Sequence, residues 1–156
     1  MSTERTATVA AVVDQGRLTA MRSVLFHAGV AARTGLNITD VACLALLDKE
    51  GPLTPGALAA QVGLTKGGAI TAVVDRLDKA GFARRRRSSQ DRRQVPVELV
   101  REGPYRDLEP LLSGVNAAYT AVTEHYSDAE LATVLDFATR VNQMLHDQTA
   151  AMRARS

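Results

Sequence analysis

Two long stretches, one at each end of the chain, carry apolar residues at helical spacing. Residues 8–35 predict one long amphipathic helix. Residues 104–153 predict two helices, separated by the capping box Ser127–Glu130. Pro110 lies inside the first of these two, where we expect a kink or a late start. The central part of the chain is too small to cover these apolar faces, which favours burial against a second copy of the chain, as a homodimer.

Shorter elements are predicted between these stretches, each bounded by cap and turn residues. Thr39 is the expected N-cap of a first short helix. Thr54 should begin a second, with a proline at its first position, and Gly63 should end it. Thr65 should cap a third, which Gly81 ends in a left-handed conformation. Two short helices joined by a tight turn are typical of a helix-turn-helix, whose second helix enters the major groove of DNA.

The periodicity changes after the third helix. Residues 82–87 and 95–100 predict two strands, and the polar stretch between them predicts a hairpin with an exposed, basic tip. The expected fold is therefore mainly α with a small β-hairpin. We expect a winged helix-turn-helix over residues 38–101, flanked by dimerisation helices at 8–35 and 104–153, within a single chain of residues 1–156.

The third helix has two distinct faces in this prediction. Ile70, Val73, Val74 and Leu77 should point inward, whereas Thr71, Asp75 and Arg76 should lie near the groove side. Its beginning contains the pair Gly67-Gly68, and each glycine costs about 1 kcal/mol relative to alanine in a helix. Either the bare backbone permits close approach to DNA, or the helix frays there. Both interpretations stay open.

Charge is concentrated in the same part of the chain. Between Leu64 and Arg101 ten basic residues face four acidic ones, a net charge of +6, whereas the rest of the chain carries −4. A basic stretch on an otherwise acidic protein indicates a polyanion site. A solvated run of surface charge is the alternative, but its position at a hairpin tip after a helix-turn-helix favours DNA.

Composition excludes several other classes. Aromatic residues are only 4% of the chain and there is no Trp, which disfavours readers of single strands or RNA that stack bases. Cys43 is the only cysteine, so an internal disulfide and a cysteine-based zinc site are excluded, and its apolar neighbours favour a packing role. No apolar run approaches the roughly 18 residues of a membrane helix. With no signal-peptide layout, we expect a cytoplasmic protein.

Catalytic and metal-binding patterns are also missing from the sequence. We find no phosphate-binding glycine loop and no nucleophile–base constellation, so we expect no enzymatic activity and no cofactor. His125 and His146 lack metal-ligand spacing, and no metal is expected. Two rival functions remain, a winged-helix module for protein contacts and an architectural protein that binds DNA without a specific site. Phosphate contacts alone carry no sequence information and cannot separate the latter from a specific regulator.

The order and spacing of these motifs resemble the multiple-antibiotic-resistance regulator (MarR) family. The resemblance is carried by residues 53–64, by residues 65–82 with Asp75-Arg76-Leu77 inside them, by the arginines of residues 84–87, and by Asp91-Arg92-Arg93. The long flanking helices extend it over nearly the whole chain. Two departures are visible, since Gly67-Gly68 replaces the commoner Ser or Thr, and residues 99–103 differ from the family's usual pattern.

This resemblance implies a dimeric winged helix-turn-helix regulator whose terminal helices interlock. The third helix would read the major groove of a near-palindromic operator, and the wing would lie on the minor groove. Arg93 would enter the minor groove, oriented by Asp91. Family members usually repress transcription and release DNA when a small molecule, often phenolic or lipophilic, binds. The DNA-binding residues expected are Thr54, Thr65, Lys66, Gly67, Gly68, Thr71, Arg76, Arg86, Arg87, Ser88, Asp91, Arg92 and Arg93.

The effector site is not fixed by the sequence. His27, near the end of the first helix, is a candidate contact for such a molecule. A structural or surface histidine is the alternative interpretation.

Overall fold

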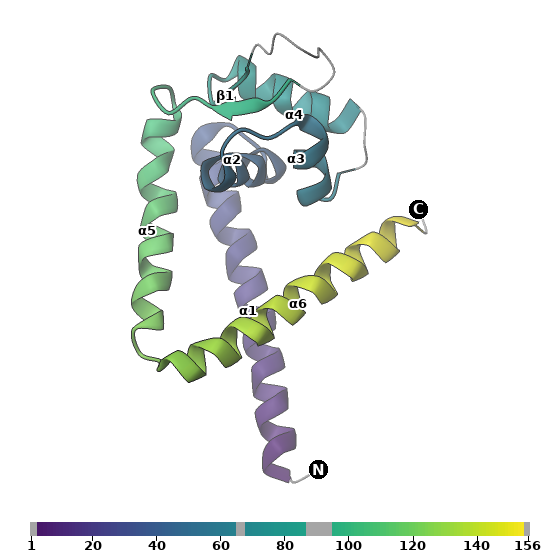
Figure 1. The fold of residues 1–156 in the computed structure, drawn as a ribbon, viewed down its shortest axis with the longest axis vertical. Helices are drawn as coiled ribbons and strands as arrows, with labels where there is room; N and C mark the ends of the chain where they lie inside the picture. Colours follow the sequence, from purple (N-terminus) through teal and green to yellow (C-terminus); the bar gives the residue numbers. More distant parts are fainter. Residues whose placement is uncertain (1–2, 65–67, 87–94, 155–156) are drawn as a thin grey trace. The chain divides into compact units, whose positions relative to one another are not determined.

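Six helices and one two-stranded antiparallel sheet form the part of the chain that the computed structural model describes, residues 3–64, 68–86 and 95–154 (Figure 1). This confirms the expected mainly α fold with a small β-hairpin. The chain divides into two compact units, residues 1–42 and 43–156, which are described separately. In chain order the elements are α1 (Thr3–Thr34), α2 (Ile38–Glu50), α3 (Pro55–Gln61), α4 (Gly68–Lys79), β1 (Ala83–Arg85), β2 (Val97–Leu99), α5 (Tyr105–Thr123) and α6 (Asp128–Ala154).

The first unit contains α1 and the beginning of α2. Gly35, with φ of +69°, ends α1, as the sequence predicted. The N-cap of α2 is Asn37, so the prediction of Thr39 was wrong. The Asn37 side-chain oxygen accepts a hydrogen bond from the Asp40 backbone N–H at 2.9 Å, and the Asp40 carboxylate accepts one from the Asn37 N–H at 3.1 Å. This reciprocal pair satisfies two N–H groups and starts the helix at Ile38.

The second unit has a core of side chains from several of its elements. The inward face predicted for α4 is confirmed, since its four apolar residues are all buried. Cys43 is also buried, which agrees with a packing role. Helix α4 packs against both α3 and β1. The buried residues of this unit are Cys43, Leu44, Leu47, Leu58, Ala59, Ile70, Val73, Val74, Leu77, Phe82, Ala83, Val97, Tyr105 and Leu108.

The hairpin is shorter than predicted, with three residues in each strand. Ala83 pairs with Leu99, Arg84 with Glu98 and Arg85 with Val97. Two further backbone hydrogen bonds continue the ladder, one at each end: 2.7 Å from Arg86 N–H to the Pro96 carbonyl and 2.9 Å from Val100 N–H to the Phe82 carbonyl.

A third segment joins this sheet, which the sequence analysis did not anticipate. Leu53 exchanges two backbone hydrogen bonds with Val97, of 3.0 and 2.8 Å, and forms an isolated antiparallel bridge. Val97 is therefore held from both sides, by Arg85 and by Leu53. This bridge ties the start of α3 to the second strand of the wing.

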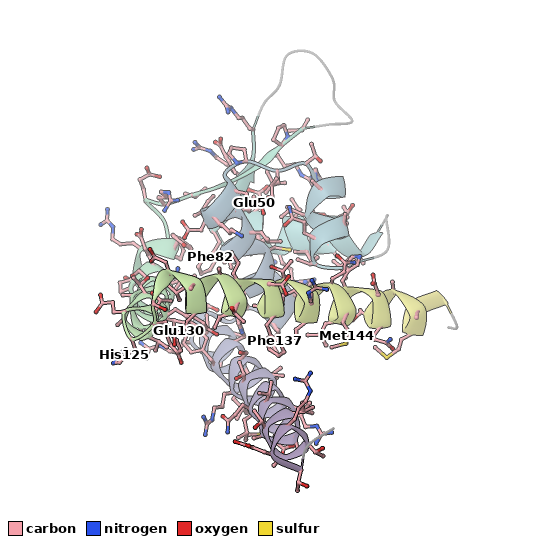
Figure 2. All side chains as sticks on the ribbon, turned by 60° about the horizontal axis from the view of Figure 1, so that its bottom comes forward. Glu50, Phe82, His125, Glu130, Phe137 and Met144 are labelled. Atoms are coloured by element: carbon pink, nitrogen blue, oxygen red, sulfur yellow. The ribbon has the colours of Figure 1, made fainter. Side chains whose placement is uncertain are left out.

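The last two helices carry exposed apolar residues. Helix α5 begins at Tyr105 and continues past Pro110, so a late start was wrong, whereas a kink stays a prediction. The predicted capping box of α6 is confirmed, with the Ser127 N–H donating to the Glu130 carboxylate at 2.8 Å. Phe137 and Met144 project from one side of α6 and extend the predicted apolar face (Figure 2). The large apolar residues exposed on α6 are Val134, Leu135, Phe137, Met144, Leu145 and Met152.

No single described helix is both long and apolar enough to cross a membrane. Helices α1 and α2 meet that criterion only when taken together across a 94° bend, by length and composition alone.

Candidate nucleic-acid interface

Local hydrogen bonds fix both ends of α3. Thr54 caps α3, since its hydroxyl oxygen accepts a hydrogen bond from the Ala57 N–H at 3.2 Å. At the other end Gly63 has φ of +66°, and the Leu64 N–H donates to the Ala59 carbonyl at 2.8 Å. A left-handed glycine with this bond is a Schellman motif, which ends a helix sharply. Helix α3 therefore ends sharply at Gly63.

Helix α4 presents a polar face of small and charged side chains. Thr71, Asp75 and Arg76 are exposed, opposite the buried apolar face, as the sequence predicted. Gly68 is the first residue of α4, and a Cβ atom built there would meet nothing within 4 Å. The space beside it is open to an approaching backbone. Gly81 ends the helix with φ of +76°, in a second Schellman motif closed by Phe82 N–H on the Leu77 carbonyl at 2.9 Å.

Of the run of arginines in the wing, the structure describes three, Arg84 and Arg85 in β1 and Arg86 directly after it. Each has a carboxylate partner. Arg84 donates to Glu98 at 2.6 Å, and Arg86 lies 3.9 Å from the other oxygen of the same carboxylate. The hydrogen bond to Glu98 raises the pKa of the Arg84 guanidinium. Arg85 instead crosses to α4 and donates to Asp75 at 2.8 Å. Among the described residues two arginines therefore share the Glu98 carboxylate.

The end of the wing is braced by Arg101. Its guanidinium donates to Asp48 of α2 at 2.6 Å, lies 3.5 Å from Glu109, and stands 5.9 Å over the ring of Tyr105. Burial, together with the Asp48 carboxylate, raises the pKa of the Tyr105 hydroxyl. Among the described residues this hydroxyl has no hydrogen-bond partner. The brace connects the exit of β2 to α2 and α5.

The predicted DNA-binding residues fall into two groups. Thr54, Gly68, Thr71, Arg76 and Arg86 are described, and all belong to α3, α4 and the wing of the second unit. The others lie outside the described residues, and for them the sequence-based prediction stands alone: Thr65, Lys66, Gly67, Arg87, Ser88, Asp91, Arg92 and Arg93.

His27, the candidate effector contact, lies in the first unit. Its Nδ1 atom is 2.7 Å from the carbonyl oxygen of Ser23, one turn earlier in α1, and its ring meets Phe26 edge-on at 5.6 Å. This local bond accounts for the ring orientation without a ligand. Binding of an effector at His27 stays a prediction.

Sequence reasoning missed the acidic partners of the wing. The alternation pattern identified Glu98 only as a polar residue of the second strand. The correct strand register would have placed it opposite Arg84. Asp75 was assigned to the groove side of α4 without its partner, because no local pattern connects it with Arg85. Among the described residues no group of three potential metal ligands was found.

Comparison with known proteins agrees with this geometry. Residues 36–95 match the family model described as MarR family. The chain is 29% identical over 132 residues to the uncharacterized HTH-type transcriptional regulator YcgE of Bacillus subtilis (strain 168), covering 85% of this chain and 84% of that protein. It is 40% identical over 82 residues to the HTH-type transcriptional repressor YetL of the same organism, covering 53% of this chain but only 48% of YetL. Both relatives are named as regulators and not as enzymes.

Solved structures share the fold. A MarR family protein from Bacillus stearothermophilus superposes with a TM-score of 0.62 at 23% identity, over 93% of this chain and 99% of that one. NadR in complex with 4-hydroxyphenylacetate gives a TM-score of 0.62 at 22% identity, over 83% and 91%. Residues 36–95 therefore match the MarR family, and the chain as a whole is similar to HTH-type transcriptional regulators and shares the fold of MarR family structures.

Proposed function

We propose that this regulator binds a specific double-stranded DNA site through α4 and the wing, and that it acts as a repressor in the cytoplasm. One observation supports this above the others. Helix α4 buries its apolar face completely and presents a polar face, and it packs beside a strand that carries consecutive arginines. A projecting helix of this kind suits the major groove, which is about 12 Å wide.

The binding form we propose is a homodimer. Both α1 and α6 expose large apolar residues, among them Val13 and Leu25 on α1 and Leu135 and Met152 on α6. Exposed apolar residues repeated along a helix suit a protein interface. In a two-fold dimer the two α4 helices would lie about 34 Å apart, one turn of DNA, so the operator would be near-palindromic.

Regulation by a small molecule belongs to the same proposal. The fold neighbour NadR was solved with 4-hydroxyphenylacetate, a phenolic anion, and we propose an effector of this lipophilic or phenolic class. Binding would be measured by calorimetry with 4-hydroxyphenylacetate and salicylate, on the native protein and on His27→Ala. Loss of binding in His27→Ala would support the candidate contact, and unchanged affinity would remove it.

A second function is architectural binding of DNA without a specific site. The arginine-rich wing is the observation that favours it. Phosphate contacts of arginines carry no sequence information, whereas base contacts from α4 would. The side chains that separate the two functions are therefore Thr71 and Arg76. Their replacement should change sequence preference if α4 reads bases, and affinity alone if it does not.

The first experiment is binding of the purified protein to the DNA upstream of its own gene and to a scrambled duplex, across a salt series. A specific regulator should prefer its own site by about a thousandfold or more. Arg86→Ala and Arg93→Ala should each weaken binding and make the log–log salt slope shallower by about 0.9 for each lost phosphate contact. Arg140→Ala is the matched control, because it removes the same charge from α6, where Arg140 pairs with Asp136 one helical turn away.

Equal binding to both duplexes would favour the architectural function, or an operator elsewhere, which selection of bound genomic fragments would decide. Failure to bind either duplex or any selected fragment would refute DNA binding.

A further inference from the structure

The two faces of the wing hairpin use their arginines differently. Cross-strand partners share a face of a sheet, and successive residues alternate between faces. Arg85 pairs with Val97, which is completely buried, so Arg85 belongs to the inner face of the wing. Arg84 and Glu98 form the outer face. The side chain of Arg85 is only 38% exposed, against 64% for Arg84 and 66% for Arg86.

The inner face is the one that meets α4. Helix α4 packs on β1, and the Arg85 guanidinium reaches across to the Asp75 carboxylate, with Nη2 and Oδ1 2.8 Å apart. Asp75 lies ten residues before Arg85 in the chain, on the far side of the turn at Gly81. The pair therefore bridges the reading helix and the first strand of the wing.

An acidic residue on the groove side of a reading helix needs a physical reason. A carboxylate there repels phosphates and contributes nothing to counterion release. In this structure Asp75 instead makes a charge-assisted hydrogen bond, which fixes the direction of a planar guanidinium. The orientation of β1 relative to α4 then decides where the following arginine, Arg86, meets DNA.

We propose that Asp75 and Arg85 form a positioning pair that sets the angle between the wing and α4, and that Arg85 contacts no phosphate. This inference rests on the proposed function, because it assigns roles within that DNA interface. The three described arginines then have different roles. Arg85 positions the wing, Arg84 is held by Glu98, and Arg86, which follows the strand, contacts the backbone of DNA.

The test uses Asp75→Asn, Arg85→Gln, the double variant, and the charge exchange Asp75→Arg with Arg85→Asp, in the full chain. Asp78→Asn is the control, since it removes the same charge from an exposed position on the same helix. Among the described residues Asp78 has no wing arginine within ion-pair distance. Affinities for the own upstream DNA and the scrambled duplex are measured across salt, and circular dichroism with thermal unfolding checks the fold of each variant.

Each single variant should lower the preference for the own site by about two- to fivefold, the range of an exposed ion pair worth up to about 1 kcal/mol. The double variant should lose no more than either single one, and the charge exchange should recover part of the preference. Arg85→Gln should keep the native salt slope. Asp78→Asn should change the affinity for both duplexes alike.

A salt slope shallower by about 0.9 in Arg85→Gln would overturn the proposal, because it would identify Arg85 as a phosphate contact. Additive losses, or an unchanged preference in Asp75→Asn, would also overturn it. These outcomes leave DNA binding by the native protein intact, whereas native protein that binds no DNA refutes the proposed function and this inference together.

Discussion

Gly103, in the turn between β2 and α5, occupies a position where a side chain meets fixed backbone. A Cβ atom built on Gly103 would lie 2.6 Å from the carbonyl oxygen of Gly81 and 3.4 Å from Cγ1 of Val100. The Gly81 carbonyl cannot move freely. Its residue closes α4 in a Schellman motif, and Phe82 beside it accepts a hydrogen bond from Val100. The φ angle of Gly103 is not in the left-handed region, so the contact alone disfavours a side chain.

We therefore expect Gly103→Ala to destabilise the protein by about 1–3 kcal/mol, the range found when a core is overpacked and backbone has to shift. In a chain of this length each kcal/mol lowers the midpoint of thermal unfolding by about 2–4 °C. The expected loss is therefore between a few degrees and about 10 °C. The displacement should act on the start of α5 and on the end of α4 together, because the added Cβ of residue 103 would meet the Gly81 carbonyl.

The measurement is unfolding by heat and by urea, followed by circular dichroism at the helix band, since the chain has no Trp. Gly56→Ala is the matched control. Gly56 is exposed in α3, and a Cβ atom there meets nothing within 4 Å, so alanine should be neutral or stabilise by up to about 1 kcal/mol. All variants are compared at one protein concentration, because the stability of the proposed dimer would depend on it. A Gly103→Ala variant as stable as the native protein would refute the steric reasoning.

Two further predictions concern helix caps. Asn37→Ala removes the acceptor of the Asp40 N–H and should lower the free energy of unfolding in urea by about 1 kcal/mol. Thr39→Ala is the control and should have a smaller effect. A larger loss in Thr39→Ala than in Asn37→Ala would contradict the observed cap. Hydrogen bonds from Ser127 lower the pKa of the Glu130 carboxyl below the ordinary value of a glutamate. Their contribution to stability is therefore complete above that ordinary pKa and is lost as the pH falls through the lower folded-state pKa. Thermal midpoints between pH 6 and pH 3 should therefore fall less in Glu130→Gln than in the native protein, and parallel curves would contradict this.

The sequence was most informative where structure depends on neighbours in the chain. The caps at Thr54 and Ser127 and the left-handed glycines Gly63 and Gly81 each need only the residues within about one helical turn. Helical periodicity predicted the buried face of α4 for the same reason. The wrong cap of α2, Thr39 for Asn37, arose because both residue types are good caps, and only the Asp40 carboxylate decides between them.

Contacts between distant residues could not be predicted in this way. The bridge between Leu53 and Val97 joins residues 44 positions apart, and Arg101 meets Asp48 across 53 positions. Their formation depends on how α2, α3 and the hairpin pack, which no single segment encodes. The strands were predicted too long because alternation continues beyond the residues that pair, although hydrogen bonds at Arg86 and Val100 continue the ladder by one step at each end.

The charged residues show most clearly the difference between what the sequence predicts and what the structure adds. The sequence gives residues 64–101 a net charge of +6, and this number indicates a polyanion site without saying which cations serve it. The structure separates them, because Arg84 is held by Glu98, Arg85 by Asp75 and Arg101 by Asp48. A cation that is already paired has less to gain from a phosphate, since that contact must first replace a hydrogen bond of similar strength. The salt dependence of DNA binding should therefore correspond to fewer phosphate contacts than the ten basic residues of this stretch would suggest.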